Sequence, residues 1–408
     1  MKRIITLVIL LVAINFSKAQ IKILFDATKA EMAGNGDWVI DADLHNLKAN
    51  SNGTVTVGGS DSNPQKTPTP AQSGITASTP ETYWTGALSA WAVDLVKRGY
   101  IVETLPYNGI ITYGDPTNVQ DLSNYKVYII DEPNLKFTTS EANALINFVN
   151  NGGGLFMISD HDVSDRNGDG WDSPGIWNDI LSNNTIQTNP FGISFDLQNI
   201  SQTSTNIANL PTDPILHGSA GTPAQIQFSN GTTMTLNKAA NPSVKGLIFK
   251  TGSSTTGTTN VLFATATYGL GKVCALGDSS VPDDGTGDPG DTLYNGYTGD
   301  ANGNHKPLLL NATIWLATSS SNLNINDLSY VTGDISIYPN PASDYIYIST
   351  GKDSNNYQYS ITDFLGRNLE TGIVTSGKIN VEKYNSGTYI LTVKSASNST
   401  KSFKFIKK

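Results

Sequence analysis

Apolar residues in the larger, N-terminal part of the chain follow two spacings, short continuous runs and a period of three to four residues. The continuous runs predict buried strands at residues 21–25, 100–105, 127–130, 155–158 and 272–276. The longer spacing predicts helices at residues 84–98, 138–149 and 306–317. Because strands and helices alternate, we expect an α/β fold in which helices cover both faces of a parallel sheet.

Two further regions differ in composition and in the spacing of their apolar residues. Residues 186–270 are rich in Thr, Ser, Asn and Gly, and their short alternating runs predict a β-rich insertion or an extension of the sheet. From residue 323 onward, apolar and polar residues alternate between turn-forming residues, as in a small all-β sandwich. We therefore expect an α/β domain at residues 20–317, a polar linker at 318–322 and a C-terminal sandwich at 323–408.

The start of the chain has the pattern of a secretory signal peptide. Lys2 and Arg3 precede an apolar run at residues 4–14, and Ser17 and Ala19 supply small residues at a cleavage site. This run is shorter than the roughly 20 apolar residues that a membrane-spanning helix needs, and no later segment supplies them. We expect residues 1–19 to be removed and the mature protein to have no transmembrane segment.

Four motifs in the C-terminal region occur in the order seen in a known family. They are Tyr-Pro-Asn-Pro-Ala at 338–342, Asp-Phe-Leu-Gly-Arg at 363–367, Ser-Gly-Thr-Tyr at 386–389 and the basic end at 404–408. Together they resemble the type A C-terminal sorting domain of the type IX secretion system of Bacteroidetes. The resemblance implies recognition by the type IX machinery, export across the outer membrane, and release or attachment at the cell surface. An immunoglobulin-like binding module would account for the strands but not for the basic end.

The distribution of charged residues along the chain indicates which classes of partner to expect. The chain has 26 Lys and Arg residues against 35 Asp and Glu residues, and the negative excess lies between residues 20 and 321. Since no basic cluster is present there, we expect no nucleic-acid partner.

A second resemblance concerns the α/β domain. The segments that carry it are residues 122–127, 137–149, 151–155, 213–215, 271–279 and 309–316. They resemble class I glutamine amidotransferase-like domains, and within these the ThuA-like (trehalose utilisation) and GldG-like (gliding motility) branches. The resemblance implies a flavodoxin-like, amidotransferase-like sheet.

Glutaminase activity is not expected from this domain. That reaction needs a cysteine nucleophile exposed on a sharp turn after a strand and activated by a nearby histidine. The corresponding turn here reads Ser159-Asp160-His161, and the single cysteine, Cys274, falls within a predicted strand. We interpret Cys274 as a small buried apolar residue.

Several polar residues stand where predicted strands end, namely Asp26, Asp131, Asp160, His161 and Asp278, and His305 stands ahead of the last helix. In a parallel sheet these ends meet at one edge, which is where such sheets bind ligands. A cluster of this kind suits a divalent metal that activates water, or a carboxylate pair for acid–base chemistry. The candidate catalytic residues are therefore Asp160, His161, Asp278, Asp26 and His305. Ordinary helix caps and turns are the alternative interpretation.

A calcium site is the candidate at residues 165–172. Their sequence is of the D-x-N-x-D-G type, which places oxygen ligands on alternate residues around a turn, as Ca²⁺ requires. The candidate ligands are Asp165, Asn167, Asp169 and Asp172. Position 12 of an EF-hand loop would be Ile176, so this is not an EF-hand, and an Asx-rich turn is the alternative.

The acidic loop at residues 283–300, with Tyr294 and Tyr297, fits a neutral carbohydrate or a second calcium site. We expect a secreted or surface-attached hydrolase acting on an extracellular polymer such as a glycan, with bound calcium. The alternative is a non-catalytic ligand-binding or surface-organising module on the same scaffold.

Overall fold

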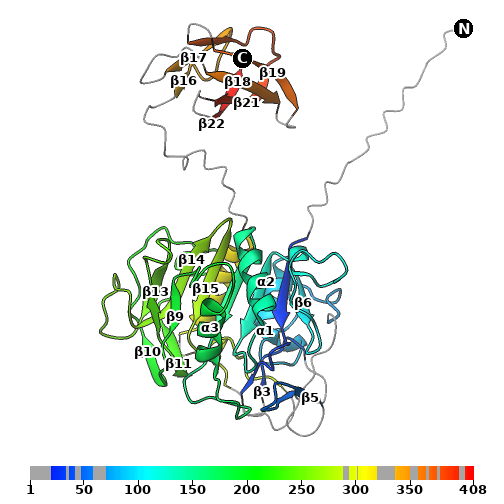
Figure 1. The fold of residues 1–408 in the computed structure, drawn as a ribbon, viewed down its shortest axis with the longest axis vertical. Helices are drawn as coiled ribbons and strands as arrows, with labels where there is room; N and C mark the ends of the chain where they lie inside the picture. Colours follow the sequence, from blue (N-terminus) through cyan, green and yellow to red (C-terminus); the bar gives the residue numbers. More distant parts are fainter. Residues whose placement is uncertain are drawn as a thin grey trace, which may run out of the picture. The chain divides into compact units, whose positions relative to one another are not determined.

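The computed structural model describes residues 20–33, 36–41, 47–57, 70–287, 294–300, 302–318, 336–349, 357–363, 367–374, 377–394 and 400–408. The expected signal peptide and residues 319–322 of the expected linker lie outside these ranges. The chain divides into two compact units, Met1–Ser320 and Ser321–Lys408, which are described separately (Figure 1). Within the described residues, no helix has both the length and the apolar character that crossing a membrane requires.

The first unit is built on a nine-stranded sheet, part of which is parallel. The parallel strands are, in spatial order, β6 (Ile101–Leu105), β1 (Lys22–Asp26), β7 (Val127–Asp131), β8 (Gly154–Ile158) and β15 (Gly271–Leu276). All five are buried or nearly so, because helices cover both faces of the sheet. The expected α/β class is confirmed.

Residues 186–270 extend this sheet in the antiparallel sense. β14 (Val261–Tyr268) pairs with β15, and the sheet continues through β12 (Met234–Leu236) and β9 (Ile193–Phe195), while β13 (Lys245–Phe249) also pairs with β14. β10 (Ile200–Ser204) and β11 (Ile226–Gly231) form a separate two-stranded antiparallel sheet. The region is therefore mainly an extension of the sheet.

In the part of the unit that the structure describes, two helices lie on each face of the sheet. α1 (Ser89–Lys97) and α4 (His305–Ala317) share one apolar core, and α2 (Thr139–Asn150) and α3 (Ser173–Ser182) share the other. Successive strand residues alternate between these cores. In β1, Ile23 and Phe25 belong to the α1/α4 core, whereas Leu24 belongs to the α2/α3 core.

Short elements complete the first unit. They are the hairpins β2 (Met32–Ala33) with β3 (Gly36–Asp37) and β4 (Leu47–Ala49) with β5 (Val55–Val57), and the 3₁₀ turns η1 (Glu81–Tyr83) and η2 (Leu122–Asn124). Figure 1 shows β3 and β5 on the side of the sheet to which β1 points.

Neighbouring residues in the sequence determine where α2 starts, but they do not determine where α1 starts. The expected capping box is present in α2, where Thr138 and Glu141 bond reciprocally. The expected start of the first helix at residue 84 is wrong, since α1 begins at Ser89. The N–H of Leu88 is bonded to Val39 O at 2.9 Å, and Asp284 accepts the N–H of Ala90 at 2.6 Å. Contacts with distant segments thus decide where this helix starts.

The sequence patterns above did not predict α3. Asp172 caps its N-terminus and Pro174 occupies its first turn, where proline is tolerated. Its buried residues include Ile176, Trp177, Ile180 and Leu181. This is helical spacing, so the apolar pattern and the capping aspartate are both present in the sequence.

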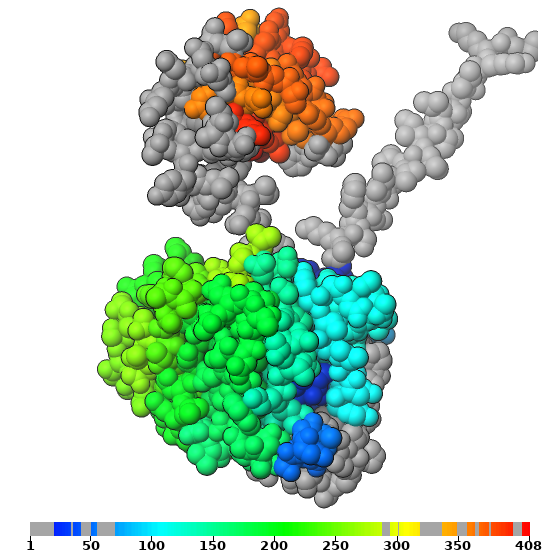
Figure 2. Space-filling model, viewed as in Figure 1, coloured from blue at the N-terminus to red at the C-terminus, as the bar shows by residue number. Residues whose placement is uncertain are grey.

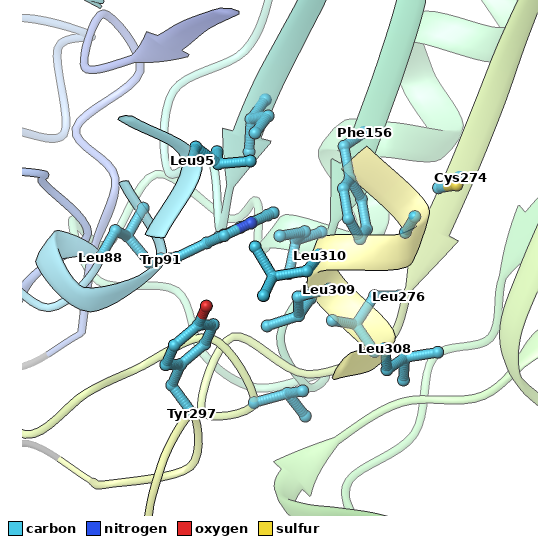
Figure 3. Packing of buried hydrophobic residues seen from close by; sticks show 14 of the residues in the cluster. Leu88, Trp91, Leu95, Phe156, Cys274, Leu276, Tyr297, Leu308, Leu309 and Leu310 are labelled. Carbon is cyan, nitrogen blue, oxygen red and sulfur yellow. The ribbon is translucent and has the colours of Figure 1, made fainter. Parts of the chain in front are cut away.

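Trp91 lies at the centre of the α1/α4 core. Its ring meets Phe25 and Phe156 edge to face, with centroids 5.6 and 5.5 Å apart. Figure 3 shows it between α1 and the leucines of α4. The same view shows Cys274 on β15, where it is buried and free, as expected for a small apolar residue. Burial raises the pKa of its thiol well above the usual value, so it is not a poised nucleophile.

The second unit consists of two antiparallel sheets. One contains β16 (Ser336–Tyr338), β17 (Tyr345–Ser349) and β20 (Lys378–Asn380). The other contains β19 (Asn368–Ile373), β18 (Gln358–Asp363), β21 (Gly387–Lys394) and β22 (Thr400–Lys407). They enclose an apolar core that includes Ile346, Ile361, Leu391 and Phe405.

One contact explains why the first and last motifs of this unit occur together. Asn340 donates a hydrogen bond to Lys404 O and accepts one from the N–H of Ile406, both at 2.9 Å. The Asn-Pro turn therefore holds the final strand in place.

We predict that Trp91→Ala lowers the free energy of unfolding by about 3–5 kcal/mol, because it opens a cavity that neighbouring rings cannot fill. Urea unfolding followed by circular dichroism measures this loss. Val119→Ala, at a side chain that is 87% exposed, is the control and should change stability by less than about 0.5 kcal/mol. Equal effects of the two substitutions would contradict the assigned core.

Candidate functional site

Polar side chains gather at the carboxyl edge of the parallel strands. β7 ends at Asp131 and leads into Glu132, and β8 leads into Asp160 and His161. The two strands are parallel neighbours in which Asp131 is opposite Ile158. The residues that follow both strands therefore emerge side by side.

Arg166 joins these two strand ends. Its Nη2 lies 3.0 Å from Glu132 Oε1 and 2.9 Å from Asp160 Oδ2, and its Nε donates to Glu132 Oε1 at 3.1 Å. Both carboxylates are buried, while the arginine reaches them from a loop with part of its side chain exposed. We call Glu132, Asp160 and Arg166 the Arg166 centre.

The second oxygen of Glu132 binds two further segments. Trp38 Nε1 and Ser279 Oγ each donate to Glu132 Oε2 at 2.7 Å. Trp38 precedes the β4–β5 hairpin, and Ser279 belongs to the turn after β15. The buried carboxylate of Glu132 is thus hydrogen-bonded to three segments that are far apart in the sequence of the first unit.

The backbone at Glu132 is strained. Its φ is +45°, in a region that residues with a side chain rarely adopt. Its N–H is nevertheless bonded to Ile158 O at 3.1 Å, which continues the pairing of β7 with β8. Such strain persists only where surrounding contacts enforce it and is concentrated at functional sites.

The charge balance of the edge is unfavourable for ionised carboxylates. Burial raises the pKa of Asp160 well above its usual value, repulsion from Glu132 and Asp278 adds to the effect, and Arg166 opposes it. Asp160 is therefore a carboxyl group that can retain a proton above its ordinary range.

Three neighbouring carboxyl groups behave in the same way. Burial raises the pKa of Asp278 to about 7 and that of Asp283 to about 8. Burial and repulsion from Glu132 also raise the pKa of Asp131 well above its usual value. Both side-chain oxygens of Asp131 are buried and have no hydrogen-bond partner within the described residues.

His161 is the predicted site residue with a route to solvent. Its side chain is 13% exposed, and its Nε2 lies 3.5 Å from Asp160 Oδ2. On the other side of the ring, Nδ1 lies 3.0 Å from the side-chain amide of Asn199. The structure therefore brings Asp160 and His161 together, as the strand-end argument expected.

The other three predicted catalytic residues have separate roles in hydrogen bonding. Asp278 accepts the N–H groups of Ser280 and Ser229 at 2.8 and 2.5 Å, which shapes the turn after β15. It still acts electrostatically on Asp160.

Asp26 accepts both the N–H and the hydroxyl of Thr28 at 3.1 Å. Burial raises its pKa, and the nearby Glu31 shares its environment. It belongs to a different network from the Arg166 centre.

His305 is buried at the start of α4. Its Nε2 accepts the N–H of Gln227 and its Nδ1 donates to Gly296 O, both at 2.8 Å. These bonds define a neutral imidazole, and burial accordingly lowers its pKa. The ring joins β11 to the loop before α4 and does not contact Asp160.

The four candidate calcium ligands lie on one loop. Asp165 accepts the N–H groups of Gly168, Asp169 and Gly170 at 2.8–3.2 Å, and Asn167 donates to Asp169 Oδ2 at 3.1 Å. Asp172 accepts the N–H of Gly175 at 3.2 Å as the cap of α3. Across the described part of the chain, no group of three or more His, Cys, Asp or Glu side chains is arranged to hold a metal ion.

Two loop tyrosines have different surroundings. Tyr297 is fully buried in the α1/α4 core, where Figure 3 shows it beside Trp91, and its hydroxyl donates to Asp94 at 3.0 Å. It is therefore unavailable for stacking on a ligand, contrary to the expectation. Tyr294 remains 44% exposed.

The sequence analysis missed the residues that organise the site. Glu132 follows a predicted strand end, so the argument applied to Asp131 could have found it. Arg166 lies inside the loop at residues 165–172, between two of the candidate calcium ligands, and no local pattern indicates its carboxylate partners. No local signal marks Trp38 as a partner of Glu132, because the contact joins residues 94 positions apart.

Comparison with known protein families gives a match within the second unit. Residues 336–408 match the family described as the secretion system C-terminal sorting domain. This confirms the expected sorting domain, which indicates export to the cell surface or the exterior and an interaction with the secretion machinery. No curated protein matches the chain.

Three solved structures are similar to parts of the chain. A cytoplasmic protein from Salmonella typhimurium is 12% identical, covers 72% of this chain and 99% of its own, and has a TM-score of 0.39. A ThuA-like protein from Parabacteroides merdae is 12% identical over 73% of this chain and 90% of its own, with a TM-score of 0.33. PorZ, a surface component of the type IX secretion system of Porphyromonas gingivalis, is 23% identical over 18% of this chain and 11% of its own, with a TM-score of 0.16.

We predict that Asp131→Asn reduces the pH dependence of stability. Unfolded Asp131 titrates near pH 3.8 and the folded residue at higher pH, so the folded state holds the extra proton and stability falls as the pH rises above about 4. Asn cannot titrate. The fall in the free energy of unfolding between pH 5 and pH 8 should therefore be smaller, by up to about 1.4 kcal/mol per pH unit.

Urea unfolding at both pH values measures this difference. Asp115→Asn, at a surface carboxyl group, is the matched control and should leave the fall between pH 5 and pH 8 unchanged. The same fall in Asp131→Asn and in the unchanged protein would contradict the raised pKa.

Proposed function

We propose that this exported protein binds an extracellular polymer, such as a glycan, at the carboxyl edge of its α/β sheet. The observation that carries the proposal is that exposed apolar side chains stand on the segments adjoining the Arg166 centre. Val163 follows the His161 turn, is 83% exposed and has φ +67°, which is rare for a β-branched residue. Leu197, in the adjoining segment, is 62% exposed.

Hydrogen bonds hold this surface in shape. The N–H of Asp162 is bonded to Gln198 O at 2.8 Å, and the N–H of Val163 is bonded to Asp172 at 2.9 Å. Val163 is thus displayed by strained backbone, and hydrogen bonds fix the segments that carry Val163 and Leu197. Exposed apolar groups held in this way are typical of a binding surface.

Binding is favoured over turnover because the carboxylates at the edge are engaged and buried. Glu132 accepts hydrogen bonds from Arg166, Trp38 and Ser279. A general acid or base must come within hydrogen-bond reach of the reacting group. Glu132 is fully buried and so does not meet this requirement.

Hydrolysis is the second candidate, and Asp160 with His161 favours it. A carboxyl group with a raised pKa is suited to general-acid catalysis. Asp160 has a raised pKa, and the partly exposed His161 lies 3.5 Å from it. Arg166 would position Asp160, and His161 would provide the contact with the polymer.

We also propose that Ca²⁺ stabilises the loop at residues 165–172. Asp165, Asn167, Asp169 and Asp172 provide oxygens from alternate or nearby positions, which is the ligand chemistry that calcium prefers. The loop leads directly into α3 and carries Arg166, so its stability affects the Arg166 centre.

Depletion from solution by insoluble cellulose, chitin, xylan and peptidoglycan tests the proposed function with the full chain. We predict binding to at least one polymer without release of reducing ends. Val163→Asp should weaken this binding about tenfold or more, because it places a charge in the apolar surface. Val119→Asp, at another exposed valine, should leave it unchanged. A protein that remains in solution with all four polymers would contradict the proposal.

Release of reducing ends in the same assay would instead support hydrolysis. In that case Asp160→Asn should abolish the release. Release that persists in Asp160→Asn would show that these residues are not the catalytic groups.

We predict that calcium raises the melting temperature of the first unit. A ligand at 100 times its dissociation constant adds about 2.7 kcal/mol of stability, which corresponds to several degrees in a unit of this size. Calorimetry in 2 mM CaCl₂ and in EGTA measures the shift, which should be smaller in Asp169→Asn than in the control Asp115→Asn. Identical melting temperatures in calcium and EGTA would show that the loop is an Asx-rich turn.

A further inference from the structure

Two adjoining clefts lie at the same edge of the sheet. The first has a volume of about 430 Å³ and is lined by Thr28, Lys29, Gly53, Tyr107, Asn108, Leu135, Lys136, Thr138 and Glu141. The second, about 600 Å³, lies between α2 and α3, and Lys136 and Thr138 line both. We call the pair the Tyr107 groove. Both volumes fall within the range of about 300–1,000 Å³ that is usual for small-ligand sites.

The walls of the groove come from segments far apart in the chain. Gly53 belongs to the β4–β5 hairpin, whereas Tyr107 and Asn108 follow β6. Figure 2 shows the blue hairpin next to the cyan surface that follows β6. A site formed by three segments can surround a ligand on several sides.

The charges in the groove neutralise one another. Lys29 Nζ lies 2.6 Å from Glu141, and Lys136 Nζ lies 3.0 Å from Asp179. Because each ammonium group already has a carboxylate partner, neither has a net attraction for an anion. The groove therefore favours an uncharged ligand.

Some polar groups in the groove have no protein partner. Within the described residues, the side chains of Tyr107, Asn108 and Thr139 make no hydrogen bonds with other residues. An amide both donates and accepts, as do the two hydroxyl groups. Neighbouring hydroxyl groups of a sugar complement this set, and the Tyr107 ring can pack against the apolar face of a sugar ring.

The groove is fixed before a ligand arrives. The N–H groups of Asn134 and Leu135 are bonded to Lys29 O at 2.9 and 3.1 Å, and the Asn134 amide donates to Ala30 O at 2.8 Å. Asn134 also donates to Glu132 O at 3.0 Å, which connects the groove to the Arg166 centre. Preformed walls reduce the entropy lost on binding.

We propose that the Tyr107 groove binds an uncharged oligosaccharide segment, with Tyr107 and Asn108 as the recognition residues. This inference rests on the proposed function and assigns its ligand class and contact residues. Lys136 extends the groove toward Trp171, since its Nζ lies 3.6 Å from the centre of that ring. A polymer chain that occupies the groove thus passes close to the partly exposed aromatic side chain of the loop at residues 165–172.

Isothermal titration of the full chain with cellohexaose, chitohexaose and xylohexaose tests the assignment. We expect at least one of these neutral probes to bind. Tyr107→Ala should weaken binding about tenfold or more, and Asn108→Ala about 3- to 10-fold, the value of one net hydrogen bond. Tyr83→Ala, at a tyrosine of η1 that is 44% exposed and lines neither cleft, is the matched control and should leave the affinity unchanged.

Four results would overturn the assignment. They are unchanged affinity in Tyr107→Ala, lost affinity in Tyr83→Ala, no binding of any neutral probe, and tighter, salt-sensitive binding of acidic hexagalacturonate. Circular dichroism of each variant separates loss of the site from loss of the fold.

These results are distinguishable from failure of the proposed function. If insoluble polymers still deplete the protein from solution but no probe binds in the titration, the protein binds a polymer and only the groove assignment is wrong. If neither experiment detects binding, both proposals are wrong.

Discussion

The carboxyl edge of the sheet depends on one cation. The guanidinium of Arg166 contacts both Glu132 and Asp160, and these two acids are buried beside other carboxyl groups. A buried charge without a partner is costly, and removal of one member of such a pair typically costs about 3–5 kcal/mol. The loop that carries Arg166 is therefore held against the ends of β7 and β8.

That contact has consequences on both sides of Glu132. On one side, Trp38 and Ser279 donate to the same carboxylate, so the segments after β1 and β15 are drawn to the site. On the other side, Asn134 connects Glu132 to the segment that forms the wall of the Tyr107 groove. The strained φ of Glu132 is the local cost of satisfying all these bonds.

The sequence predicted those features that arise from neighbouring residues. Thr138 and Glu141 form a capping box, which needs only two residues three positions apart. Asp160 and His161 directly follow a buried run, so their place at the sheet edge could be predicted. His305 satisfied the same kind of argument, yet both nitrogens of its buried ring are bonded to the backbone, at Gln227 and Gly296, so the ring joins two segments of the fold.

The features that the sequence determined depend on short-range interactions, and those that only the tertiary structure decided depend on long-range contacts. Spacing and motifs by themselves determined the α/β class, the C-terminal sandwich and its sorting signal, since each depends on short-range periodicity or on a local motif. Only the tertiary structure decided that Arg166 pairs with Glu132 and Asp160, that α1 starts at Ser89, and that Tyr107 lines a groove. These outcomes depend on contacts between segments that only the folded sheet brings together, and no local pattern encodes which buried charge meets which.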